Sequence, residues 1–187
     1  MNLPDDLQNE VAIFVRSGFY DREEISTIFL EEIYEPGDLD PQVLEATVDA
    51  ALASHEVEKK SWPAVTDYDR LRTAFETLVA QGVIAMHNAG NTQSDGISDF
   101  REALANTPDK SKILGYCFYH WQDVEHAVEG RGLYLAFGPS DPKEEETRGV
   151  EVGNMVTDAL KQVGLLTSWD GTFNKRILLP DFAWKRR

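Results

Sequence analysis

The sequence predicts a soluble, acidic protein of the α/β or α+β class, with acidic helices first and a mixed sheet of about five strands after them. Three observations support this prediction. Apolar residues recur at helical spacing through residues 1–80, short and nearly continuous apolar runs begin at residue 83, and helical segments separate those runs. The predicted order is four helices, then βαβαβα, then a C-terminal β-hairpin.

The first two helices are predicted from their caps as well as from their apolar stripes. Residues 4–17 form the first helix, and Gly18 is placed to end it because glycine readily adopts the left-handed conformation found there. Asp21 and Glu24 have the spacing of a capping box. In that motif a short side chain accepts an early backbone N–H, and the acid three positions later accepts the N–H of the first residue.

The third and fourth helices are bounded in the same way. Asp40 and Pro41 open the third helix, because proline is tolerated at the first helical position. His55 falls on the apolar stripe of this helix and is expected to be a hydrogen-bonded histidine in the core. The fourth helix begins at Thr66 or Asp67 and shows apolar residues at every third or fourth position.

The remaining chain alternates short apolar runs with helical segments. The first two runs enter polar loops, and about a dozen residues separate the second run from the third. That length is near the lower limit for a parallel crossover, so the second and third strands are parallel in one alternative and antiparallel in the other. The predicted strands are 83–86, 113–119, 133–137, 165–169 and 175–179.

The absence of a linker rich in Gly, Pro or Ser predicts a single compact unit over residues 1–187. We expect a helical subregion at 1–80 and an α/β subregion at 81–187. No apolar stretch is long enough for a membrane span, and the N-terminus does not resemble a secretory signal. The one cysteine, Cys117, lies in an apolar run and is expected to be buried. These features predict a cytoplasmic protein.

The net charge of −15 is uneven along the chain. Residues 1–80 contain 18 acidic and 6 basic side chains, whereas residues 81–187 contain 15 and 12. Nucleic acid is therefore not expected as a partner, because binding to phosphates relies on Lys and Arg. An acidic surface suits either solubility alone or the docking of a basic partner. The basic tail at 185–187 could pair with the acidic helices.

Two polar segments share a pattern, since each begins with a histidine at the end of a predicted strand. A glutamine and an aspartate then precede the next helix in both. If the two strands are parallel, both histidines lie at the carboxyl edge of the sheet, where ligands bind in open α/β proteins. The candidate ligand-binding residues are His87, Asn88, Gln93, Asp95, His120, Gln122 and Asp123.

The same residues also suit a purely structural role. Asp95 and Asp123 each precede a helix and could cap it, while Lys175 and Arg176 lie in a turn and are expected to be solvated. No strong metal or nucleophile motif is present, so catalytic residues, metals and cofactors are not assigned. The first hypothesis is therefore a non-enzymatic binding or regulatory module for a protein or small-molecule ligand.

The alternative is a metal-dependent hydrolase that uses the histidines and aspartates at the strand ends. Imidazole and carboxylate groups are common metal ligands, and imidazole can also move a proton near neutral pH. The sequence leaves open whether the protein is an enzyme, and it does not give the oligomeric state.

Several short runs resemble a family of bacterial domains of unknown function, over nearly the whole chain. This resemblance implies a single unit in a bacterial cytoplasm and implies no activity. The runs are GFYD at 18–21, EPGDL at 35–39, HNAG at 87–90, TQSDG at 92–96, GYCFYHWQD at 115–123 and WDGT at 169–172.

Overall fold

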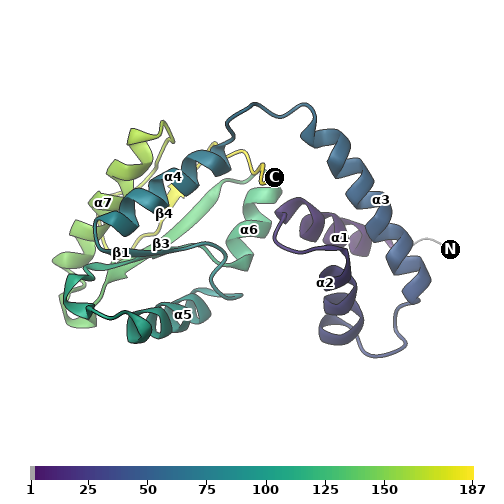
Figure 1. The fold of residues 1–187 in the computed structure, drawn as a ribbon, viewed down its shortest axis with the longest axis horizontal. Coiled ribbons are helices and arrows are strands. Elements are labelled where there is room, and N and C mark those ends of the chain that lie inside the picture. The colour runs from purple at the N-terminus through teal and green to yellow at the C-terminus, as the bar shows by residue number, and fades with distance from the viewer. Residues whose placement is uncertain (1–2) are drawn as a thin grey trace. The chain divides into compact units, whose positions relative to one another are not determined.

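The computed structural model describes residues 3–187 and has a mixed α+β fold (Figure 1). The predicted fold class is confirmed. The chain forms two compact units: one contains the residues up to Thr66 together with 185–187, and the other is Asp67–Trp184. That the whole chain behaves as a single compact unit stays a prediction.

The first unit is helical and buries apolar side chains from each of its helices. Val11, Ile25, Phe29, Leu44 and Val48 are fully buried. The helices are α1 (Asp5–Ser17), α2 (Arg22–Thr27), its π-helical continuation η1 (Ile28–Ile33) and α3 (Pro41–Lys59).

The helix caps read from the sequence are present. Gly18 ends α1 with a φ of 72°, in the left-handed region. Asp21 accepts the N–H of Glu24 at 2.9 Å, and the Glu24 carboxylate accepts the N–H of Asp21 at 2.8 Å, so the capping box is complete. Asp40 caps α3 through the N–H of Gln42 at 2.9 Å.

The C-terminal tail belongs to the first unit, where two of its arginines lie over aromatic rings. The Arg186 guanidinium is 4.1 Å from the centre of the Phe19 ring. The Arg187 guanidinium lies 5.8 Å from the Trp62 ring and donates to the Pro63 carbonyl. These contacts are of the cation–π type, which suits arginine because its guanidinium is planar and weakly hydrated.

The second unit places helices on both faces of a four-stranded mixed sheet in the order β1-β2-β3-β4. Strand β2 is parallel to β1 and antiparallel to β3, and β3 is antiparallel to β4. The strands are β1 (Val83–Met86), β2 (Gly115–Phe118), β3 (Leu133–Pro139) and β4 (Ile177–Leu179). The helices are α4 (Asp67–Ala80), α5 (Gln93–Asn106), α6 (Trp121–Val128), α7 (Arg148–Gln162) and the 3₁₀ turns η2 (Lys110–Lys112) and η3 (Pro142–Glu144).

Side chains alternate between the two faces of the sheet, as expected for extended strands. Tyr119 directs its ring toward Phe75 of α4, with the ring centres 6.2 Å apart. Tyr116 packs against Phe100 of α5, with the ring centres 4.6 Å apart. Helices α4 and α7 pack against each other on the first of these faces (Figure 1). We call the two faces the α4 face and the α5 face.

The sheet has four strands because one arm of the predicted hairpin is not a strand. Ser168 forms a single antiparallel bridge with Leu178, and no other residue of the predicted strand 165–169 pairs in this way. Most hydrogen bonds of β4 are therefore made to β3. The connection between β2 and β3, which the sequence left open, is antiparallel.

Cys117 is fully buried in β2, as expected, and burial raises the pKa of its thiol. His55 is also buried as expected, at 4% exposed, and its ring packs edge-on against Trp62 with the centres 5.3 Å apart. The expectation that it is hydrogen-bonded was wrong, because neither ring nitrogen has a hydrogen-bond partner among residues 3–187.

Charge is distributed more evenly between the units than along the sequence. The first unit contains 15 acidic and 7 basic side chains, and the second contains 18 and 11, which gives net charges of −8 and −7. The acidic start of α4 belongs to the second unit, and the basic tail belongs to the first. The acidic surface is therefore a property of both units.

Candidate functional site

The loops that follow β1 and β2 leave the sheet at the same edge, because these strands are parallel. Their pairing, which ends at Met86 and Phe118, continues past the strands. The N–H of Ala89 donates to the Tyr119 carbonyl at 2.9 Å, and the N–H of Trp121 donates to the Gly90 carbonyl at 3.0 Å. Residues 87–91 and 119–122 are thus neighbouring segments, and this edge is the candidate site.

His87 lies on the α4 face of this edge. Its ring stacks on Phe75 with the centres 4.6 Å apart, and its Nδ1 is 2.8 Å from the Tyr119 hydroxyl. Tyr68 and Trp184 complete the aromatic surroundings. The centre of the Tyr68 ring is 5.6 Å from that of His87 and 5.6 Å from that of Trp184. His87 is therefore held by an aromatic cluster on one face of the sheet.

His120, Asp123 and Arg176 form a polar cluster at the start of α6. Asp123 is 2% exposed and His120 is 4% exposed. The Asp123 carboxylate lies 3.1 Å from His120 Nε2 and accepts the His120 backbone N–H at 3.2 Å. Arg176 donates to its other oxygen at 2.8 Å. The buried carboxylate is thus paired and hydrogen-bonded, as a buried charge must be.

His120 Nε2 lies between two groups that require opposite protonation of this nitrogen. It is 3.1 Å from the Asp123 carboxylate, which only accepts hydrogen bonds, and 3.2 Å from Arg176 Nη1, which only donates them. Burial lowers the pKa of His120, which keeps the imidazole neutral, so one ring nitrogen carries hydrogen. His120 Nδ1 is buried and has no hydrogen-bond partner among the described residues.

Arg176 reaches this cluster from the residue before β4, on the α5 face. Its guanidinium also lies 4.7 Å from the centre of the Tyr134 ring. The prediction that Arg176 is a solvated turn residue was wrong. A lone arginine beside a short apolar run gives no sequence signal for a buried acid 53 positions away.

Asp95 lies at the start of α5, where it completes a capping box with Thr92. Its carboxylate accepts the Thr92 N–H and hydroxyl, both at 2.9 Å. The hydrogen bond from the Thr92 hydroxyl is the main cause that lowers the pKa of Asp95, and the nearby His120 contributes. The structural reading of Asp95 as a capping residue is therefore correct.

Asn88 has a φ of 51°, a conformation that asparagine tolerates better than most residues. Its Oδ1 is buried and has no hydrogen-bond partner among residues 3–187. Gln93 and Gln122, the first and second residues of α5 and α6, are exposed. The edge thus offers two buried polar atoms without a partner in residues 3–187, one each from Asn88 and His120, and two exposed amides.

The seven predicted residues share one edge, yet they are divided between the faces of the sheet. His87 contacts α4, whereas His120 and Asp123 lie with Arg176 on the α5 face. Within the part of the chain that the structure describes, no three His, Cys, Asp or Glu side chains are grouped so that they could hold a metal ion. The metal-dependent alternative lacks a ligand set here.

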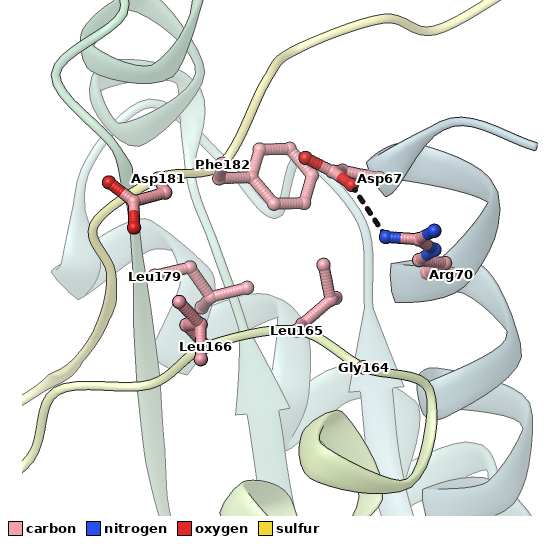
Figure 2. Close-up of a pocket in the computed structure, with 8 residues that line it drawn as sticks. All are labelled: Asp67, Arg70, Gly164, Leu165, Leu166, Leu179, Asp181 and Phe182. Atoms are coloured by element: carbon pink, nitrogen blue, oxygen red, sulfur yellow. Dashed lines mark hydrogen bonds and ion pairs between the residues drawn. The ribbon is translucent and has the colours of Figure 1, made fainter. Parts of the chain in front are cut away.

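A small pocket elsewhere in the second unit was not predicted from the sequence. It lies between the start of α4, the turn after α7 and the segment after β4, and its volume is about 180 Å³ (Figure 2). Half of its lining residues are leucine or phenylalanine, which the sequence pattern alone places in the core. The residues that line it are Asp67, Arg70, Gly164, Leu165, Leu166, Leu179, Asp181 and Phe182.

The fold and its edge define an α+β domain with polar loops at the carboxyl ends of a parallel strand pair. The chain belongs to the family DUF6891, a domain of unknown function, whose model matches residues 2–187. No curated protein and no solved structure matches the chain. None of the helices in residues 3–187 is long and apolar enough to cross a membrane.

Proposed function

We propose that the protein is a non-enzymatic binding module whose ligand occupies the carboxyl edge of β1 and β2. The observation that supports this proposal is a pair of buried polar atoms, Asn88 Oδ1 and His120 Nδ1, which have no hydrogen-bond partner among residues 3–187. Buried polar atoms are nearly always hydrogen-bonded, and an unsatisfied one costs roughly 1–3 kcal/mol. A ligand that hydrogen-bonds to these atoms would remove this cost.

The chemistry of the edge favours a ligand rich in N–H groups. Asn88 Oδ1 can only accept a hydrogen bond, and burial keeps His120 neutral by lowering its pKa. The Asp95 carboxylate adds negative charge close enough to influence His120. Amides, ammonium groups and guanidinium groups meet these requirements, whereas carboxylates and phosphates do not.

Binding is favoured over catalysis because the reactive groups are held in place. His120 is fixed by Asp123 and Arg176, and its Nδ1 has no serine, threonine or cysteine hydroxyl or thiol in hydrogen-bond contact. Cys117 is fully buried with a raised pKa, so its thiol remains protonated and is a poor nucleophile. Nucleophilic catalysis would require the nucleophile to lie within hydrogen-bond distance of its base.

The proposed setting is the cytoplasm of a bacterium, with a protein or small molecule as the ligand. A single buried cysteine suits a reducing compartment, because it neither forms an internal disulfide nor requires one. Nucleic acid is not proposed as a partner, since each unit has a net negative charge. Subcellular fractionation of the native host tests the compartment.

The binding test uses small probes and reads the ¹⁵N chemical shift of His120 Nδ1 by NMR. We expect acetamide, methylammonium and methylguanidinium to shift this resonance in a saturable way, with acetate as the acceptor-only control. Asn88→Gly removes one acceptor and keeps the backbone conformation, because glycine adopts a positive φ readily. Affinity should fall three- to tenfold, the effect of losing one hydrogen bond.

Asn91→Gly is the matched control, because Asn91 is an exposed residue of the same loop. This variant should bind the probes as the wild type does. The proposal is wrong if no N–H donor moves the His120 resonance. It is equally wrong if a crystal structure shows ordered water hydrogen-bonded to both Asn88 Oδ1 and His120 Nδ1 while every probe stays unbound.

A further inference from the structure

The pocket in Figure 2 has an apolar floor with charged groups at its two ends. Leu165, Leu179 and Phe182 are nearly fully buried and form the floor. Leu166 is 68% exposed and stands at the rim. An exposed leucine beside a small cavity gives a bound alkyl chain apolar surface on more than one side.

The charges around the pocket leave one carboxylate without a partner. Asp67 accepts the backbone N–H of Ala183 at 3.0 Å and a hydrogen bond from Arg70 at 3.3 Å (Figure 2). Asp181 lies at the opposite end of the floor, and no hydrogen bond or ion pair links it to another residue in 3–187. Since Asp67 and Arg70 balance each other, the pocket has a net charge of about −1 and favours a cation.

The volume limits what this cation can be. A pocket of about 180 Å³ is smaller than the roughly 300–1,000 Å³ that nucleotides and most cofactors need. We therefore expect a small cation, such as the side chain of lysine with its four methylenes and ammonium group.

We propose that this pocket is a binding site for a primary alkylammonium group, with Asp181 as its counter-ion and the leucines against its alkyl chain. The site is separate from the strand-end site and uses none of its residues. Free alkyl diamines and the lysine side chain of a partner protein share this chemistry. The net charge of −7 on the second unit attracts either source.

The test titrates n-butylammonium chloride into the full-length protein and follows backbone amide shifts by ¹H–¹⁵N NMR. We expect saturable shifts at Leu179, Asp181 and Phe182, with a dissociation constant on the order of millimolar for so small a ligand. Butanol, the neutral analogue, should bind at least fivefold more weakly.

Two variants separate the pocket from a general effect of charge. Asp181→Asn should weaken n-butylammonium binding about tenfold and leave the fold intact, because Asp181 is exposed and makes no contact that would be lost. Asp99→Asn, an equal loss of charge on the exposed side of α5, should bind as the wild type does. Equal binding of butanol, or unchanged binding in Asp181→Asn, overturns the proposal.

Two further probes distinguish the sources of the ammonium group. Tighter binding of 1,4-diaminobutane than of n-butylammonium supports a free diamine, whose second charge reaches the Asp67 end. Tighter binding of N-acetyl-lysine amide supports a lysine of a partner protein. Absence of saturable shifts with all three amines rejects the site.

Discussion

Removal of the Arg176 guanidinium is the sharpest test of the polar cluster at the start of α6. In the variant Arg176→Met the Asp123 carboxylate, only 2% exposed, keeps the hydrogen bond from the His120 backbone N–H and loses its cation. Breaking a buried ion pair by removing one partner costs about 3–5 kcal/mol. The Arg176 side chain is 33% exposed, so solvent moderates the loss, and we expect about 3 kcal/mol.

A double-mutant cycle shows whether this cost comes from the buried charge. Asp123→Asn keeps an oxygen that accepts the His120 N–H and removes the negative charge, so we expect a loss of about 1–2 kcal/mol. The double variant should be more stable than the sum of the single effects by at least about 1 kcal/mol. Urea denaturation followed by circular dichroism and tryptophan fluorescence measures each free energy of unfolding.

Lys175→Met is the matched control, because Lys175 is exposed and adjacent in sequence. It should change the free energy of unfolding by less than about 0.5 kcal/mol. If Arg176→Met costs no more than this control, the ion pair does not stabilise the fold. If the single effects simply add, Arg176 and Asp123 do not act on each other. The position of the His120 ring between these two side chains then loses its support.

Two further predictions concern pH and packing. Burial lowers the pKa of both His55 and His120 in the folded protein. The unfolded chain therefore binds more protons near the ordinary histidine pKa of about 6.5, and the free energy of unfolding should fall as the pH is lowered from 7.5 to 5.5. A flat profile in urea denaturation contradicts this. Gly115→Ala should cost about 2–4 kcal/mol, because the added Cβ would lie 2.1 Å from the Gly138 carbonyl oxygen of the neighbouring strand; an unchanged urea midpoint contradicts this.

The helices were predictable because their signals are local. The capping box at Asp21 and Glu24 and the cap at Asp40 depend on residues within a few positions of one another. Gly18 ends α1 for a reason that also involves one residue, its access to positive φ. These helix caps depend only on the few residues that form them, so the spacing of those residues in the sequence is sufficient to predict them.

The strands were harder to predict because pairing depends on distant residues. The run at 165–169 has the composition of a strand, yet only Ser168 bridges to a partner, which is Leu178 of β4. The direction of β3 relative to β2 also could not be predicted. A connection of about a dozen residues permits both directions, and packing against the helices selects one.

The candidate site was predictable only in part. The sequence placed His87 and His120 at one edge, and the parallel pairing of β1 and β2 brings the two loops to that edge. It did not reveal that alternation directs His87 toward Phe75 and His120 toward the opposite face. A shift of one residue in strand register moves every side chain of that strand to the other face of the sheet, and the register is set by pairing between strands.

Taken alone, the sequence determined an acidic chain of the α/β or α+β class with capped N-terminal helices, a buried cysteine and two polar loops at strand ends. These properties follow from composition and from contacts within one or two helical turns. The tertiary structure alone decided that β3 is antiparallel to β2, that Arg176 neutralises Asp123, that His120 Nδ1 and Asn88 Oδ1 are buried with no hydrogen-bond partner in residues 3–187, and that Asp181 stands beside a pocket with an apolar floor. The burial and partners of these groups depend on segments that are far apart in the chain, and such segments meet only when the sheet and its helices have packed.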